Sequence, residues 1–429
     1  METGTMKIYK HPSPEQWTPL LERPQGDSRS LDKSVRKIMD AVRRRGDRAV
    51  RKYSKEFDGV SLRTMELRDK AFREAAKALD PALAAAIRQA AENIRRFHAT
   101  QQATEPLVET MPGVRCWRRS IAIESVGLYV PGGTAPLFST VLMLGIPAVL
   151  AGCPDIVLCT PPDANGDVHP AILYAASVVG IRRVFRVGGV QAIAAMTFGT
   201  ESIPRVHKVF GPGNRYVTHA KQLAQHEGIA IDMPAGPSEV CVLADQSANP
   251  EFVAADLLSQ AEHGTDSQVL LVSDSPALLD DVQLALQRQL DLLGRKTLAE
   301  GALSHSKAIM VKDLDEAMTI VNAYAPEHLI LACEEPDRWA EKVRSAGSVF
   351  LGHYTPESAG DYASGTNHTL PTNGYARAYS GVSVDSFVKK VTFQQITREG
   401  LQDLGPVVVQ MAEAEGLQGH AEAVRVRLR

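Results

Sequence analysis

The sequence predicts an α/β protein made of two doubly wound, Rossmann-like domains, with small helical segments at both ends of the chain. After Glu124, short β-branched or apolar runs alternate with helical patterns, which is typical of parallel strands joined by crossover helices. The alternation comes in two successive series of similar length, so we expect two sheets. The length of 429 residues agrees, because a domain takes about 150 residues.

The elements can be assigned in order along the chain. Between Leu31 and His98, apolar residues recur at three- and four-residue spacings among charged ones, which predicts amphipathic helices. In the first series, strands are expected at residues 125–130, 155–160, 182–187 and 206–211, and helices at residues 135–152, 170–180, 191–199 and 215–228. In the second series, strands are expected at residues 239–245, 268–274, 308–311, 327–333 and 348–352, with one helix ending at residue 263 and others at residues 276–294, 314–325 and 337–347.

The last quarter of the chain has a different texture. Residues 353–387 are rich in Gly, Thr, Asn and Ser, and a loop of this length in a compact domain is usually functional. The C-terminus then returns to helix, because Leu404, Val407 and Met411 lie on one apolar stripe. A break at Gly416 precedes a short second helix, which carries His420.

The composition excludes several classes of protein. Fifty acidic and 47 basic residues leave a net charge of −3, so neither nucleic acid nor a membrane surface is expected as a partner. The most apolar run, residues 135–152, is interrupted by hydroxyl residues, a glycine and Pro147, which predicts a buried helix and no membrane span. The N-terminus lacks the apolar core of a signal peptide, and the five cysteines are scattered without CxxC spacing. We therefore expect a cytoplasmic protein.

The stretch "QAEHG" offers candidate metal ligands. Gln260 and His263 share one helix face at i, i+3 spacing, whereas Glu262 projects elsewhere. A helix end with His263 near the last carbonyls, followed by a glycine cap, explains the same residues without a metal. Asp361 and His420 would complete a set of nitrogen and oxygen ligands that suits Zn²⁺. Spacing alone does not join these four residues.

"NAYAPEHLILA" places Glu327 and His328 at the entrance to an apolar strand. An ionisable pair there is costly unless it is partnered or used, so it is a candidate for general acid/base catalysis. A simple strand start remains the alternative interpretation.

Glycine-rich turns follow three of the expected strands, as in many phosphate sites. None has the G-x-G-x-x-G fingerprint, because in "FGPGNRYV" Tyr216 stands where the third glycine would be. The motifs alone therefore leave a nucleotide site open. The sequence has no G-x-S-x-G or Walker A motif, and we interpret its cysteines as small buried residues.

Together the motifs resemble the histidinol dehydrogenase family. The matching motifs are "YVPGG", "FGPGNRYV", "DMPAGPSEV", "QAEHG", "NAYAPEHL", "GDYASGTNHTLPT", "SGVSVDSF" and "EAEGLQGHA", in order from about residue 30 to the C-terminus. The departures are mild: Gly264 replaces a common aspartate and Val382 a common leucine.

The resemblance implies oxidation of L-histidinol through L-histidinal to L-histidine, with reduction of two NAD⁺. It implies one Zn²⁺ per subunit and a homodimer whose site is shared between subunits, with His420 supplied by the partner subunit. The implied roles are as follows: Glu327 and His328 catalytic; Gln260, His263, Asp361 and His420 metal ligands that also contact substrate, as His328 does; Ser238, His368 and Glu415 further substrate contacts; Tyr129, Gln191 and Asn214 NAD contacts.

The resemblance also implies a division of the chain. Residues 1–24 would form an N-terminal arm, 25–128 and 237–381 a discontinuous first α/β domain with the metal and catalytic residues, 129–236 a second α/β domain with the NAD contacts, and 382–429 a helical dimerisation tail.

Chemistry agrees with these roles, since a neutral His328 can take the hydroxyl proton and Glu327 can activate water for the second oxidation. The metal would orient the substrate. A family member that oxidises a sulfonated diol is one alternative, but Ser238, His368 and Glu415 suit a cationic amine and imidazole better. A non-catalytic metal-binding protein is another, and it would be expected to lack Glu327 or His328.

Overall fold

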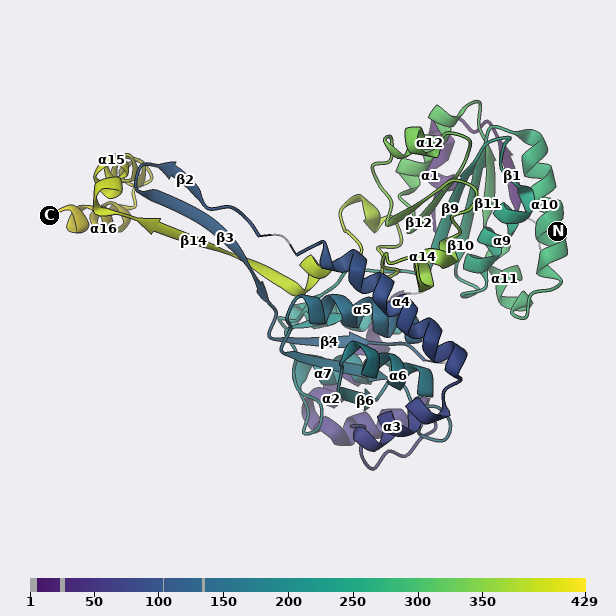
Figure 1. Cartoon of the computed structure of the whole chain (residues 1–429), viewed down its shortest axis with the longest axis horizontal. Coiled ribbons are helices and arrows are strands. Elements are labelled where there is room, and N and C mark those ends of the chain that lie inside the picture. Colours follow the sequence, from purple (N-terminus) through teal and green to yellow (C-terminus); the bar gives the residue numbers. More distant parts are fainter. Residues whose placement is uncertain (1–5, 24–27, 103, 133–135) are drawn as a thin grey trace.

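The computed structural model describes residues 6–23, 28–102, 104–132 and 136–429. Its strands form a six-stranded sheet, a five-stranded sheet and a three-stranded sheet. Strand pairs in the two larger sheets are parallel, and helices cover them (Figure 1). The α/β class and the two parallel sheets are confirmed.

The six-stranded sheet has the order β1-β11-β10-β9-β12-β13. Its strands are β1 (Lys7–Lys10), β9 (Glu239–Ala244), β10 (Gln268–Ser273), β11 (Lys307–Met310), β12 (His328–Ala332) and β13 (Ser348–Leu351). One face packs against α9 (Pro250–Ala261), α10 (Pro276–Leu290) and α11 (Lys296–Leu303). The other packs against α1 (Pro14–Leu20), α12 (Leu314–Tyr324) and α13 (Pro336–Ala340).

The five-stranded sheet has the order β6-β5-β4-β7-β8. Its strands are β4 (Ser125–Tyr129), β5 (Asp155–Thr160), β6 (Arg183–Arg186), β7 (Lys208–Phe210) and β8 (Ala230–Ile231). One core contains α3 (Asp69–Ala78), α4 (Pro81–Ala99), α5 (Phe138–Leu150) and α6 (Pro170–Val179). The opposite core contains α2 (Ser28–Phe57), α7 (Gly189–Phe198) and α8 (Arg215–His226).

The expected division of the chain needs correction in its N-terminal part. It assigned residues 25–128 to the domain of the six-stranded sheet, but α2, α3 and α4 pack against the helices of the five-stranded sheet. The apolar stripe predicts which helix face is buried but not which sheet buries it. Residues 7–10, expected in a separate arm, form an edge strand instead; residues 1–5 and 24 lie outside the described residues.

A C-terminal arm projects away from both α/β domains (Figure 1). It consists of β2 (Val108–Met111), β3 (Val114–Ala122), β14 (Val388–Ile396), α15 (Arg398–Ala414) and α16 (Gln418–Leu428). The expected tail was helical throughout, and this was wrong for β14, which pairs antiparallel with β3 along its whole length. Alternating side chains, including a stack of Phe393 on Trp117, favour that strand pair.

The long polar loop contains α14 (Glu357–Tyr362) and the short 3₁₀ turns η1 (Tyr375–Arg377) and η2 (Val384–Phe387). Among the described residues, no helix combines the length and hydropathy that crossing a membrane requires. The apolar run near residue 140 is instead the buried helix α5, and residues 133–135 before it lie outside the described residues.

Candidate active site

Glu327 and His328 lie at the amino end of β12, which pairs with β9 and with the edge strand β13 of the six-stranded sheet, and both are buried. The backbone N–H of Glu239, at the start of the neighbouring β9, donates to Glu327 Oε2 at 2.9 Å. Gly347 packs against the backbone of Glu327, because a Cβ at residue 347 would lie 2.5 Å from the Glu327 carbonyl oxygen. The two neighbouring strands thus fix the catalytic pair predicted from sequence.

His328 is surrounded by acceptors. Its Nδ1 lies 3.3 Å from the carbonyl oxygen of Glu239 and 3.5 Å from Glu357 Oε1, while its Nε2 lies 3.5 Å from Asp361 Oδ1. Burial alone would lower the pKa of His328, but Glu357, Glu327 and Asp361 raise that pKa well above its ordinary value. Burial raises the pKa of Glu327 to about 8.

Three of the four predicted metal ligands come from two neighbouring helices, α9 and α14. Gln260 is buried in the last turn of α9, and its Oε1 has no hydrogen-bond partner within the described part of the chain. His263 follows α9 and turns its Nδ1 to the carbonyl of Ser259 at 3.0 Å, which leaves Nε2 for another partner. Burial would raise the pKa of Asp361, yet this pKa is lowered because His328, His368 and His263 face the carboxylate.

The fourth predicted ligand is elsewhere. His420 and the predicted substrate contact Glu415 are exposed and lie in the C-terminal arm, far from α9 and α14 in Figure 1. A single chain does not bring them to the other site residues.

Ser238, His263, Glu327 and His368 line a pocket of about 480 Å³ between the two α/β domains. Its opposite wall is the loop after β7, with Gly213 and Asn214. His368 Nε2, like Gln260 Oε1, is buried and has no partner among the residues described. The pocket wall therefore includes a histidine nitrogen that remains free for a ligand.

The predicted NAD contacts gather at the carboxyl ends of β4, β6 and β7. Tyr129, Gln191 and Asn214 line a second pocket of about 780 Å³. The hydroxyl of Tyr129 accepts a hydrogen bond from Gly189 N at 3.1 Å, and Asn214 caps α8. Gly211 has φ +127°, and a Cβ there would overlap the carbonyl oxygen of Tyr129, so only glycine fits.

A buried ion pair anchors this loop. Lys221 Nζ lies 2.5 Å from Asp232 Oδ1 and also donates to the carbonyl of Gly211 at 2.8 Å. Asp232 in turn accepts the N–H of Gly211 at 2.8 Å. The loop that separates the two pockets is therefore held by charged groups out of contact with water.

Two carboxyl groups near the site were missed by sequence reasoning. Glu357 is buried beside His328, and its position four residues before Asp361 was the only signal, since i, i+4 residues share a helix face. Asp58 lines the pocket of the predicted NAD contacts, with Oδ2 at 3.5 Å from Gln191 Nε2. Burial raises the pKa of Asp58 to about 6. Nothing in the local sequence separates it from ordinary surface acids.

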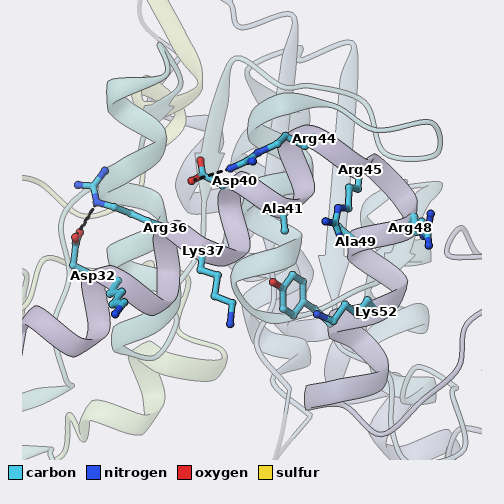
Figure 2. Close-up of a pocket in the computed structure, with 12 residues that line it drawn as sticks. Asp32, Arg36, Lys37, Asp40, Ala41, Arg44, Arg45, Arg48, Ala49 and Lys52 are labelled. Atoms are coloured by element: carbon cyan, nitrogen blue, oxygen red, sulfur yellow. Dashed lines mark hydrogen bonds and ion pairs between the residues drawn. The ribbon is translucent and has the colours of Figure 1, made fainter.

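A hollow of about 900 Å³ on the surface contains none of the predicted site residues (Figure 2). It follows α2, which kinks at Gly46, where the Glu201 carboxylate accepts the N–H of Asp47 at 2.7 Å. Its basic side chains are partly neutralised along the same helix, for example by the pair Arg36–Asp32. A solvated helix face explains this hollow.

Comparison with known proteins identifies the family. A sequence model described as histidinol dehydrogenase matches residues 21–428. The chain belongs to the histidinol dehydrogenase family. The curated histidinol dehydrogenase of Bacteroides thetaiotaomicron is 57% identical over 423 residues, covering 99% of both chains. That of Xylella fastidiosa is 56% identical over 396 residues, covering 92% of both.

The crystal structure of histidinol dehydrogenase from Elizabethkingia anophelis has the same fold. It matches with a TM-score of 0.97 at 52% identity and covers 100% of this chain and 99% of the other. The family resemblance drawn from the sequence motifs is confirmed.

Proposed function

We propose that this chain is an NAD-dependent enzyme that oxidises L-histidinol through L-histidinal to L-histidine, the last steps of histidine biosynthesis. Family membership supports the reaction, and one geometric observation carries it: the pocket between the domains is lined by Glu327 and His263 on one wall and by Asn214 on the other. Glu327, a predicted metal ligand and a predicted NAD contact thus share one cavity.

In its neutral form, which its raised pKa shifts to higher pH, His328 acts as the general base for the alcohol. Nδ1 faces the carbonyl of Glu239, which can only accept, so the hydrogen of a neutral ring is on Nδ1. Nε2, which has no hydrogen-bond partner among the described residues, is left to take the hydroxyl proton. Bound NAD⁺ would accept the hydride from the same carbon, and a second NAD⁺ would accept the hydride released in the second oxidation. In the second oxidation, Glu327, once ionised above its raised pKa of about 8, takes a proton from the water that adds to the aldehyde, and the backbone N–H of Glu239 holds its side chain in place.

The residues fit a zinc ion. Gln260, His263, Asp361 and a partner-supplied His420 combine one carboxylate with neutral ligands, a set that Zn²⁺ accepts. A buried amide oxygen without a partner costs about 1–3 kcal/mol, and a ligand for Gln260 Oε1 would remove that cost. Bound zinc would supply positive charge that orients the substrate nitrogens.

We propose a homodimer in which the arm of each subunit completes the site of the other. The arm carries His420 and Glu415, and it exposes a set of large apolar residues: Val108, Ile121, Ile396, Val407, Met411, Leu417 and Val426. Exposed apolar residues gathered on a projecting element are typical of an interface. We also propose a cytoplasmic location, consistent with five free cysteines.

The reaction is tested by NADH absorbance on adding L-histidinol to the zinc-loaded protein. We expect two NADH per histidinol, with activity lost on chelation and restored by Zn²⁺. Turnover of a sulfonated diol without turnover of histidinol would overturn the proposal.

The shared site is tested by mixing inactive His328→Asn and His420→Asn proteins. With free subunit exchange, half of the dimers are mixed and each has one intact site, so roughly a quarter of the wild-type activity should return. No recovery despite demonstrated exchange would mean that each site is built within one chain.

A further inference from the structure

Glu357 is a buried carboxyl group that the proposed mechanism does not use. Its side chain is 1% exposed, and Oε2 has no hydrogen-bond partner in the described part of the chain. Its other oxygen, Oε1, lies 3.5 Å from His328 Nδ1. Because a buried carboxyl group without partners is costly, its position beside the proposed base needs an explanation.

The helix α14 places one carboxyl group at each nitrogen of the His328 ring. Glu357 faces Nδ1, and Asp361, one helical turn later, faces Nε2. Gly360 permits this close approach, since a Cβ there would lie 2.6 Å from the ring of Phe350. Phe350 in turn packs near His328, with ring centroids 6.0 Å apart. A carboxyl group therefore lies at each nitrogen of the His328 ring, and Phe350 lies on one side of it.

We propose that Glu357 is a positioning residue, which, with the carbonyl of Glu239, holds the Nδ1–H of His328 and so aims Nε2 at the substrate hydroxyl. This inference rests on the proposed function, in which the proton passes from that hydroxyl to Nε2. Glu357 itself exchanges no proton in the step. When ionised, Glu357 stabilises the imidazolium that forms, as a carboxylate does behind the histidine of other acid/base pairs.

A competing role is that of a metal ligand. One atom each of His328, Glu357 and Asp361 lie within 4.8 Å of one another, which is close enough for one ion. Glu357 faces Nδ1, the nitrogen that also faces the Glu239 carbonyl, whereas Asp361 faces the opposite nitrogen. This arrangement favours a role of Glu357 in positioning the His328 ring. Measuring the zinc content of Glu357 variants distinguishes this role from that of a metal ligand.

The test compares Glu357→Leu and Glu357→Gln in the zinc-loaded full-length protein. Leucine removes the acceptor, so kcat should fall by at least about 100-fold with KM for histidinol and zinc content unchanged. Glutamine keeps an acceptor oxygen and should recover part of kcat. Glu262→Gln makes the same chemical change outside the catalytic machinery and should leave kcat unchanged.

A second readout does not depend on turnover. The ¹⁵N signals of the His328 ring should report hydrogen on Nδ1 in the wild type and a mixture of tautomers in Glu357→Leu. Loss of zinc together with activity would make Glu357 a metal ligand, and an unchanged kcat or tautomer would refute the positioning role. If wild type fails to oxidise histidinol while the tautomer still shifts, the proposed function fails and the positioning role stands.

Discussion

The two parallel sheets place their site residues at opposite edges. In the six-stranded sheet, Ser238 precedes β9 and the Glu327–His328 pair stands at the start of β12, so the site lies at the amino ends. In the five-stranded sheet, Tyr129 ends β4 and Asn214 follows β7, so the pocket lies at the carboxyl ends, as is usual for doubly wound folds. The cavity between the domains lies where these two edges meet.

The position of the two sites at opposite sheet edges has an electrostatic consequence. Helices that cross between parallel strands end at the amino edge of a sheet and begin at its carboxyl edge. Gln260 and His263 lie at the C-terminal end of α9, where partial negative charge favours a cation by about 0.3–1 kcal/mol. The N-termini of α7 and α8 face the other pocket and favour phosphate. The opposed edges thus suit a metal with a cationic substrate on one side and a dinucleotide on the other.

Of the predicted changes, removal of the metal should have the largest effect, and it should affect the site at the amino edge without affecting the pocket at the carboxyl edge. Chelation is expected to lower turnover by at least about 100-fold, because the substrate loses its orientation. The affinity for NAD⁺, measured by titration calorimetry, should stay unchanged, since the carboxyl-edge pocket contains no proposed zinc ligand. A matching loss of NAD⁺ affinity would show that the edges are not independent.

Breaking the ion pair behind the amino edge should have the next largest effect. Arg23 pairs with the buried Glu239 at 2.7 Å and lies over the Tyr324 ring. Arg23→Met leaves that carboxylate unpaired and should cost about 3–5 kcal/mol of unfolding free energy, measured by denaturant titration. Arg36→Met breaks an exposed pair on α2 and should cost at most about 1 kcal/mol. Equal costs would contradict this account.

Gly211→Ala should impair NAD⁺ binding at the carboxyl edge and leave the metal site at the amino edge unchanged. A Cβ at this position meets the Tyr129 carbonyl, and the strained backbone adds about 1–3 kcal/mol. We expect KM for NAD⁺ to rise while zinc content stays constant. Gly180→Ala is the matched control, because that glycine also has positive φ but open space around it. If both variants behave alike, backbone strain alone explains the result.

The smallest effect concerns Asp58. Its pKa of about 6 in the folded chain exceeds the ordinary 3.8, so the folded state binds the proton more tightly. Stability from this group is therefore gained as pH falls from about 6 toward 3.8, and at pH 7 the charged group is destabilising. Asp58→Asn should be more stable than wild type at pH 7, by at most about 1 kcal/mol because the group is half-exposed. The difference in unfolding free energy between Asp58→Asn and wild type should vanish below pH 4. A difference that does not change with pH would refute the raised pKa of Asp58.

Much of the fold could be predicted from sequence. The strands expected at residues 239–245 and 268–274 appear as β9 and β10, because fully buried parallel strands have continuous apolar runs. The antiparallel ribbon of the arm was missed, since β14 has a mixed polar pattern and its residues pair with β3 residues 266 to 282 positions earlier. Local periodicity does not encode such distant pairing.

The residues of the candidate site were likewise predicted only in part from the sequence. The spacing of Gln260 and His263 was enough to aim both to one face, but only family resemblance joined them to Asp361. Glu357 could not be found from sequence, because an acid in a polar loop reads as exposed until burial is known.

The edge strand β1 has a consequence for synthesis on the ribosome. Lys7–Lys10 are made first, yet their partner β11 begins at residue 307, so β1 must wait for most of the chain. Except for the arm strands β2 and β3, residues 28–231 form the five-stranded sheet and its helices, and all of them are made before β9. Since domains fold as units during translation and distant contacts close slowly, the coenzyme-side domain should emerge folded while the catalytic domain is still incomplete. The N-terminal strand, although made first, would then join its sheet only after β9, β10 and β11 have been made.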